Sequence, residues 1–440
     1  MSRLLPACVF LVFAAIPLRS QIVLQHPGAV FWGRFSPDGQ QVATVCSDGS
    51  GRVWSIDGSL LHTLAGHRAS VTGVEFSRDG SRIVTAGFDS TARIWDANTG
   101  ALLHTLRGHG GRVRQAIFSP DGALVATASL DGTARLWNSA TGDTLHVLRG
   151  HTQGVFDIAF SPDGKQVATA SNDLTGRIWD VSTGMSTVTL TGHAQRLVSI
   201  IYDHSGNRLI TTGFDPVAYV WDSTGALVDS IVHTARINSA FFSADDRRVL
   251  TSSFDTTARL TTLDRSVEPV IYRGHADPLL WAEFDPSETM VVTSGFDNSA
   301  RVYTLAGDTL MTLRHNGRVP LALFSPTDPS ILTIGFDSTA RIWSLPAGEV
   351  GVEQRSRRSL DIRIDGNGTA MIEYNIDRRA PVIVMIIDTQ GTEVFRLPQG
   401  VLEPGPYHTM ADLSSLPSGV YFCSLTGGDT SATRRFVMTR

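Results

Sequence analysis

One motif recurs eight times along this 440-residue chain, and it constrains the fold more than any other feature. Each copy has a His, a Thr 18 residues later and an Asp 22 residues after the His; six copies add a Trp six residues after the Asp. Successive His residues lie 40 to 42 positions apart. A period of this length predicts supersecondary units that stack and bury a continuous core. The second, third and fourth copies are His67, Thr85, Asp89, Trp95; His109, Thr127, Asp131, Trp137; and His151, Thr169, Asp173, Trp179.

Each unit is predicted to form four short antiparallel strands. In the second unit, residues 71–76 alternate in polarity, residues 77–80 form a Ser-Arg-Asp-Gly turn, and residues 82–86 and 91–95 have strand composition. A further turn leads into residues 101–106, the fourth strand. Ser-Pro-Asp-Gly repeats the first turn in three other units, with Pro and Gly in the positions that such turns favour.

The repeated unit resembles WD-repeat β-propeller proteins. Five copies begin with Gly-His, and three end in Trp-Asp at residues 95–96, 179–180 and 221–222. The resemblance spans about three-quarters of the chain, residues 21–345, and implies an all-β fold with an eight-bladed propeller. Residues 22–25 are then placed to close the ring on the blade that ends at Trp343. Seven blades are usual in the family, so a seven-bladed ring with one aberrant unit is the alternative.

The recurring His, Thr and Asp have the side chains of a hydrolytic triad, but an active site normally occurs once and not eight times. The resemblance implies a structural tetrad instead, in which Asp, His, Thr and Trp are joined by hydrogen bonds within each blade. The sixth and seventh copies have Thr261 and Tyr303 in place of Trp, and we expect their blades to be weaker. No unique polar cluster is evident that breaks the repeat, so no catalytic residue is assigned and the chain is expected not to be an enzyme.

In this family the residue before each Asp, and those three and five after each His, border the upper mouth of the ring. Phe and Arg dominate these positions here, a composition typical of interaction hot spots. Packing of Phe between duplicated units is the competing interpretation, and carbohydrate or surface-polymer binding, or a propeller enzyme using the central pocket, are alternative functions. The predicted partner-binding rim comprises Phe31, Phe88, Arg112, Arg114, Phe156, Arg196, Phe214, Arg236, Phe254, Phe296, Arg318 and Phe336.

The two ends of the chain have other patterns. Residues 1–20 contain a mostly apolar run after Arg3 and are interpreted as a secretory signal peptide. Residues 346–358 are polar and read as a linker. Residues 359–440 hold seven strand-like segments and no copy of the repeat, which predicts a small β-sandwich.

Two turn motifs in this last region resemble the C-terminal sorting domain that type IX secretion systems of certain Gram-negative bacteria recognise. They are the hairpin at residues 387–394 and the segment at residues 412–421, followed by a basic, apolar chain end. The resemblance implies secretion through the periplasm to the cell surface or beyond, with the type IX machinery as a partner. The residues that carry it are Asp388, Gly391, Leu416, Gly419 and Tyr421.

Composition limits the remaining function classes. The formal net charge of −5 gives no reason to expect nucleic acid as a partner. Three Cys, one of them in the predicted signal peptide, make a disulfide framework improbable. No phosphate-binding Gly-rich loop, zinc spacing or calcium loop is recognisable, so neither a cofactor nor a metal is expected. After the signal peptide no segment is long and apolar enough to span a membrane.

Overall fold

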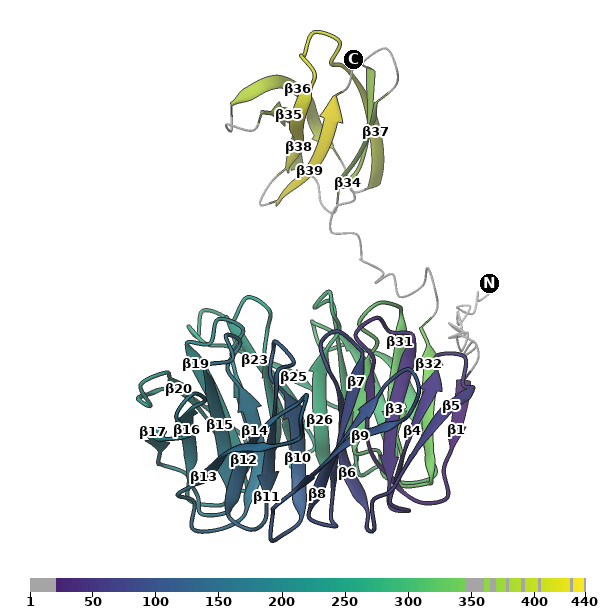
Figure 1. The fold of residues 1–440 in the computed structure, drawn as a ribbon. Helices are drawn as coiled ribbons and strands as arrows, with labels where there is room; N and C mark the ends of the chain where they lie inside the picture. Colours follow the sequence, from purple (N-terminus) through teal and green to yellow (C-terminus); the bar gives the residue numbers. More distant parts are fainter. Residues whose placement is uncertain are drawn as a thin grey trace, which may run out of the picture. The chain divides into compact units, whose positions relative to one another are not determined.

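A computed structural model describes residues 21–345, 360–364, 369–376, 380–388, 392–402, 405–427 and 430–438. These residues contain strands and no helix. The chain divides into two compact units, Met1–Pro346 and Ala347–Arg440. The predicted signal peptide (1–20) and linker (346–358) lie outside the described residues. Figure 1 shows the first unit as a ring of sheets and the second as a small set of strands.

The first unit contains eight four-stranded antiparallel sheets, the blades of a propeller. We number each blade by the motif copy that it contains. The innermost strands of neighbouring blades contact one another around the ring. From blade 1 to blade 8 these strands are β2 (Val30–Phe35), β6 (Val71–Phe76), β10 (Val113–Phe118), β14 (Val155–Phe160), β18 (Leu197–Tyr202), β22 (Ile237–Phe242), β26 (Leu279–Phe284) and β30 (Leu321–Phe324).

Three further strands complete each blade. The second strands are β3 (Gln41–Cys46), β7 (Arg82–Gly87), β11 (Leu124–Ser129), β15 (Gln166–Ser171), β19 (Arg208–Gly213), β23 (Arg248–Ser253), β27 (Met290–Gly295) and β31 (Ser330–Ile334). The third strands are β4 (Ser50–Ser55), β8 (Thr91–Asp96), β12 (Thr133–Asn138), β16 (Gly176–Asp180), β20 (Val217–Asp222), β24 (Ala258–Thr262), β28 (Ser299–Thr304) and β32 (Thr339–Ser344). The outer strands are β5 (Leu60–Ala65), β9 (Leu102–Arg107), β13 (Thr144–Arg149), β17 (Ser186–Leu190), β21 (Leu227–Val232), β25 (Val270–Tyr272), β29 (Thr309–Arg314) and, in blade 8, β1 (Gln21–Gln25).

The N-terminal strand closes the ring as the sequence predicted. β1 pairs antiparallel with β32, from Gln21 opposite Trp343 to Gln25 opposite Thr339. The last blade therefore takes its outer strand from the start of the chain, and the ring has no unpaired end. The eight-bladed prediction is confirmed, and the seven-bladed alternative does not match the eight sheets.

Inner strands carry a β-bulge that determines what the channel wall contains. In blades 1 to 7 the register against the second strand shifts by one residue just after the first strand residue. A bulge leaves one residue out of the ladder and re-aims side chains. The bulged residues are Phe31, Thr72, Arg114, Phe156, Val198, Asn238 and Leu280, and all of them line the central channel.

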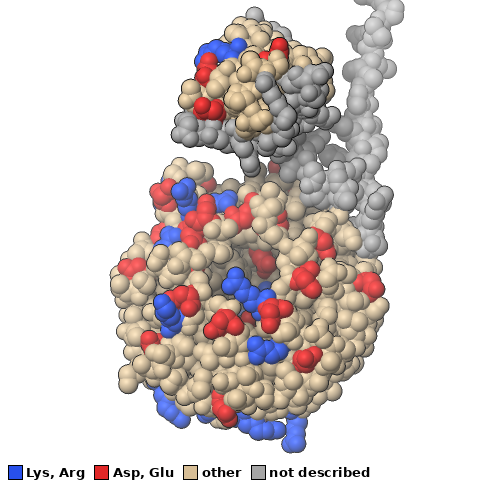
Figure 2. Space-filling view, turned by 45° about the horizontal axis from the view of Figure 1, so that its top comes forward, with Lys and Arg blue, Asp and Glu red and all other residues tan. Residues whose placement is uncertain are grey.

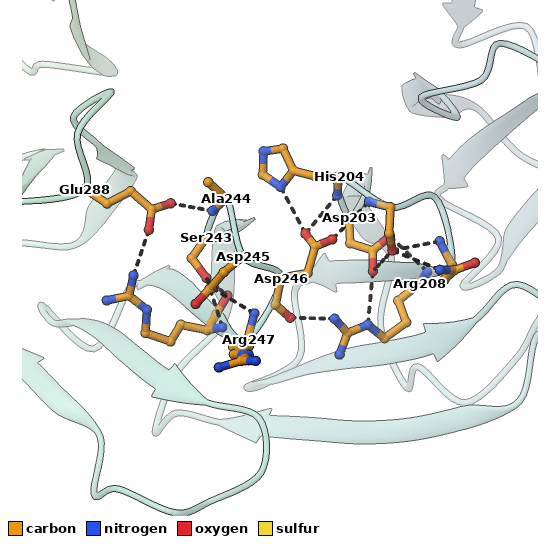
Figure 3. A network of polar contacts seen from close by, with 12 residues as sticks. Asp203, His204, Arg208, Ser243, Ala244, Asp245, Asp246, Arg247 and Glu288 are labelled. Atoms are coloured by element: carbon orange, nitrogen blue, oxygen red, sulfur yellow. Dashed lines mark hydrogen bonds and ion pairs between the residues drawn. The ribbon is translucent and has the colours of Figure 1, made fainter. Parts of the chain in front are cut away.

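Turns between inner and second strands lock blades 5, 6 and 7 together (Figure 3). Asp246 and Glu288 occupy the position that Gly holds in the turns of blades 1 to 5, with φ of 57° and 52°. The Asp246 carboxylate accepts hydrogen bonds from the N–H groups of His204 (2.8 Å) and Ser205 (2.9 Å) in blade 5. Glu288 accepts from the Arg248 guanidinium (2.7 Å) in blade 6. Blade 6 is the one that has Thr261 for Trp, so these clamps support the irregular part of the ring.

The second unit is a pair of antiparallel sheets. One contains β33 (Leu360–Ile364), β34 (Thr369–Ile376) and β37 (Gly405–Asp412); the other contains β36 (Glu393–Leu402), β35 (Ala380–Ile387), β38 (Gly419–Gly427) and β39 (Thr430–Met438). Ile372, Val384 and Ile386 are fully buried in one core with Cys423 and Leu425. The predicted hairpin after Ile387 is present, since β35 and β36 pair there and the Asp388 N–H donates to Thr392 O.

Candidate functional site

The tetrads of the second, third and fourth copies have one geometry. In the second copy His67 Nδ1 lies 3.0 Å from Asp89 Oδ1, and His67 Nε2 lies 2.9 Å from Thr85 Oγ1. Trp95 Nε1 donates to the same Thr85 hydroxyl at 2.9 Å. The other two tetrads repeat these contacts at 2.8 to 2.9 Å: His109, Thr127, Asp131, Trp137 and His151, Thr169, Asp173, Trp179.

Charges in the tetrad are fixed by burial and by hydrogen bonds. Burial lowers the pKa of His67, and the nearby Asp89 opposes that shift only in part. Burial alone would raise the pKa of Asp89, but hydrogen bonds from the Arg68 N–H and from His67 outweigh it and lower the pKa to about 2. A neutral His and an ionised Asp joined to backbone and Thr leave no free nucleophile, so the tetrad acts as a structural link.

The first copy departs from the expected tetrad. His26 Nδ1 lies 2.9 Å from Leu24 O, and no hydrogen bond joins His26 to Asp48 within residues 21–345. Asp48 instead accepts from Arg52 at 2.8 Å. In the other seven copies the Asp also accepts the N–H of the residue after His, but here that residue is Pro27, which has no N–H. Pro27 thus removes an anchor that holds Asp against His, and the expectation of a tetrad in every blade is wrong for blade 1.

Blades 6 and 7 lack the Trp link in different ways. In blade 6, Thr261 has no indole donor, and the outer strand β25 of this blade is only three residues long. Tyr303 is fully buried and donates its hydroxyl hydrogen to Arg273 O at 3.1 Å. His233 and His275 still contact the Asp and Thr of their own copies.

The contacts among the twelve predicted rim residues form three groups: Phe31 with Phe336; Phe88, Arg112, Arg114 and Phe156; and the other six. Arg236 stacks on Phe254 at 3.5 Å and on Phe214 at 4.0 Å, measured from the guanidinium carbon to the ring centroid. Arg196 also stacks on Phe214, with its guanidinium carbon 3.8 Å from the ring centroid. The remaining contacts are Arg112 with Phe88 (4.7 Å), Arg114 with Phe156 (4.2 Å), Arg318 with Phe296 (4.5 Å), Phe254 with Phe296 (5.6 Å) and Phe31 with Phe336 (5.8 Å).

The rim carries positive charge that no carboxylate of the described residues neutralises by an ion pair. None of the five rim Arg side chains forms an ion pair with a carboxylate of the described residues. Arg112, Arg196 and Arg318 are exposed, while Arg114 and Arg236 are half-buried, and their Nε atoms are buried without a hydrogen-bond partner. Burial lowers the pKa of both Arg114 and Arg236. An Arg stacked on an aromatic ring keeps its in-plane donors free for an incoming anion.

The rim opens into a cavity of about 560 Å³ in the central channel, lined from all eight blades. The opposite end has a separate cavity of about 320 Å³ that shares no lining residue with the first. Figure 2 shows the face opposite the rim, which carries the turns between inner and second strands; it is hollowed at its centre, with acidic and basic side chains interspersed around the hollow. Of the rim residues, seven line the larger cavity: Phe31, Phe88, Arg114, Phe156, Phe214, Arg236 and Phe336.

Channel-facing residues that the sequence analysis did not single out form an unrepeated cluster. The Trp32 and Trp281 rings pack edge to face at 5.3 Å, and Arg34 lies 5.5 Å from the first and 5.9 Å from the second. Trp281 Nε1 donates to Glu283 at 3.0 Å, and Phe241 packs on Trp281 at 4.9 Å. The expectation that no polar cluster breaks the repeat is therefore wrong.

Carboxylates in the channel wall are held away from their usual charge state. Burial raises the pKa of Glu75 to about 7 and also raises that of Glu283, while the positive charge of Arg34 opposes both shifts. Burial raises the pKa of Asp157 to about 6, although its oxygens accept the N–H groups of Ile200 (3.1 Å) and Ile158 (2.9 Å). All three residues are half-buried; Asp157 lines the larger cavity and Glu75 the smaller one.

A signal for this cluster was present in the sequence. The positions six and eight after each His carry Trp32 and Arg34 in blade 1, Glu75 in blade 2, Asp157 in blade 4, and Trp281 and Glu283 in blade 7. The position five after each His varies in chemistry as well, from Phe31 to Thr72, Arg114 and Asn238. Comparing the copies column by column, and taking the columns that fail to repeat, would have located the channel wall.

Residues predicted for the sorting domain lie in two turns. Leu416 is buried, Tyr421 donates its hydroxyl hydrogen to Pro417 O at 3.1 Å, and Gly419 pairs with Met438. Asp388 accepts from the Thr392 N–H at 2.9 Å. Gly391 lies outside the described residues.

The described residues offer neither a metal-binding cluster nor a membrane-spanning helix. They contain no group of three or more His, Cys, Asp or Glu side chains able to hold a metal ion. They also contain no helix of the length and apolarity needed to cross a bilayer.

Comparison with protein families identifies both units. The model described as "WD domain, G-beta repeat" matches residues 19–55, 58–96, 100–138, 142–180, 184–222, 226–261 and 268–304, which correspond to seven of the eight copies. The model described as "Secretion system C-terminal sorting domain" matches residues 366–439. No curated protein matches the chain.

Proposed function

Since the chain belongs to the WD-repeat family and ends in a type IX sorting domain, we propose that it is an exported, non-enzymatic scaffold that binds a protein partner through the propeller rim. A sorting domain of this kind directs secretion to the cell surface or exterior. The claim that the rim binds a protein partner rests on the arrangement of its Phe and Arg side chains.

One observation carries the binding proposal: stacked, half-exposed Phe and Arg side chains form a rim with unneutralised charge. Phe254 and Phe296 are in edge-to-face contact, and Arg236 and Arg318 extend the row on either side. Aromatic and Arg side chains supply much of the binding energy at protein interfaces because they bury large areas with few rotatable bonds. Packing between duplicated units alone would not require Arg to stack on the exposed side.

The test replaces rim residues that do not line the cavity. The variant F254S/F296S/R318Q should lose the partner that the full-length protein captures at the cell surface, while L102S/L103S, at exposed positions on the outer strand β9, should keep it. Retention of every captured protein by the rim variant, with its melting temperature unchanged, would refute the proposal.

The export route is a second part of the same proposal. We infer that the chain crosses the inner membrane with its N-terminal leader, and that residues 360–440 then pass it from the periplasm of a Gram-negative cell to the type IX machinery. Deleting residues 360–440 should leave the propeller in the periplasm. Normal amounts of the truncated chain outside the cell would contradict this route.

A catalytic role for the channel is the second candidate, and the observation that favours it is the pair Glu75 and Glu283, whose pKa values are raised by burial. Shifted carboxylates of this kind are suited to general acid–base chemistry. Their channel wall supplies no His, Cys or Lys among the described lining residues. If hydrolysis of a surface polymer were found and were lost in both E75Q and E283Q with folding intact, the scaffold proposal would have to give way to this one.

A further inference from the structure

The larger channel cavity has more positive than negative charge. Its ionisable lining residues are Arg34, Arg114, Arg236 and Asp157. Both oxygens of Asp157 are occupied by backbone N–H groups, and no ion pair joins this carboxylate to a lining Arg among the described residues. The cavity therefore presents cationic donors without an ion-pair partner among the described residues, although the charge of Arg114 acts on Asp157 and that of Arg34 on Glu75 and Glu283.

Arg114 and Arg236 are the two cations best placed to receive one. Each is a rim residue that also lines the cavity, and each has its guanidinium stacked on a Phe ring, at 4.2 Å for Arg114 and 3.5 Å for Arg236. Stacking fixes the plane of the guanidinium, which lowers the entropy lost when it binds a carboxylate. Their Nε atoms are buried and have no hydrogen-bond partner.

Deeper in the channel the wall is aromatic. Trp32 and Trp281 contact each other, and Phe241 extends the same surface. A volume of about 560 Å³ is in the range of sites that enclose a small ligand or a few side chains.

Rim and cavity are continuous, because Phe31, Phe88, Phe214 and Phe336 belong to both. A partner bound on the rim can therefore reach the channel with an extended segment. We propose that the channel takes an acidic side chain of the rim-bound partner, held by Arg114 or Arg236, with an adjacent aromatic or large aliphatic residue against Trp32 and Trp281. This inference rests on the proposed function and adds the chemistry of the partner to it.

Arg residues of the same rim provide a matched control. Arg112 stacks on Phe88 and Arg196 on Phe214, at 4.7 and 3.8 Å, but both are exposed and neither lines the cavity. The double variants R114Q/R236Q and R112Q/R196Q therefore remove the same charge and the same kind of stacking contact. They differ in whether the lost guanidinium faces the channel.

The experiment selects displayed, randomised heptapeptides on the full-length protein. The enriched peptides should carry Asp or Glu next to an aromatic or large aliphatic residue. Affinity for the most enriched peptide should fall about ten-fold or more in R114Q/R236Q, as expected for lost hydrogen bonds to charged groups, and by less than about three-fold in R112Q/R196Q. Changing the acidic residue of that peptide to its amide should cost a similar factor on the unmodified protein, a measurement that needs no folded variant.

Several results would overturn the inference. Enriched peptides without an acidic residue, or equal losses in the two double variants, would each do so. The outcome is separable from the rim test. Loss of the partner in F254S/F296S/R318Q with no acidic preference refutes only the inference, whereas an acidic preference with an unaffected partner refutes only the proposed function.

Discussion

The tetrads and the channel wall lie in the same blades and follow opposite rules. Around the ring the Thr and His of each copy stay in contact at 2.7 to 2.9 Å. On the inner strands of those blades, Arg34, Glu75 and Phe241 occupy one equivalent position and have nothing in common. Repetition is what a scaffold needs, since each blade must solve the same packing problem. A binding wall has no such need, so chemistry that is not repeated indicates where a ligand would be recognised.

The largest difference is expected between two Thr→Val substitutions. One removes a Thr of a repeated tetrad, and the other removes a Thr of the channel wall, where the copies differ. Thr169→Val leaves the His151 Nε2 acceptor without its donor and the Trp179 Nε1–H without its acceptor, and we expect it to lower the free energy of unfolding by about 3 kcal/mol. Thr72→Val, on the half-buried channel wall, should change it by less than about 0.5 kcal/mol. Urea unfolding followed by Trp fluorescence gives both values, and equal losses would contradict the distinction.

A smaller difference is expected between regular and irregular blades. Blade 6 lacks the indole bond that Trp95 makes in blade 2, which corresponds to about 1 kcal/mol and to roughly five-fold to ten-fold faster opening. Backbone amides of β24 should therefore exchange hydrogen faster than those of β8 by that factor. Breaking the clamp with Glu288→Ala should widen the gap, because Glu288 binds Arg248 and the Ala244 N–H in the same blade. Equal protection of β24 and β8 would show that the clamps fully replace the Trp bond.

The pH dependence of the channel wall should be the smallest effect, and its sign is fixed by Glu75. Its pKa in the folded chain, about 7, lies above the usual value of 4.5, so its contribution to stability is complete below pH 4.5 and is lost as pH rises through 7. Glu75→Gln should leave the melting temperature nearly unchanged at pH 5 and raise it at pH 8. Because Gln stays neutral, a variant that is less stable at pH 8 than the parent would contradict the assignment.

Sequence reasoning reached the scaffold more completely than the site. The constant spacing of His67, Thr85, Asp89 and Trp95 predicted the blade, and the run before His26 predicted ring closure, because both depend on patterns that repeat. It missed the effect of Pro27, whose missing N–H releases Asp48, because that effect appears only once the partner of each carboxylate oxygen is known. Most of the channel wall was missed as well, since the bulge that turns Thr72 and Asn238 into the channel is a property of strand pairing.

The rim is where the account can be tested most directly. A photo-crosslinking amino acid placed at Phe296, which stacks with Arg318, should capture a discrete partner on intact cells. The same group at Leu102, exposed on the outer strand β9, should capture none. Capture of the same proteins from both positions, or from Leu102 alone, would contradict the claim that the rim is the binding surface of the propeller.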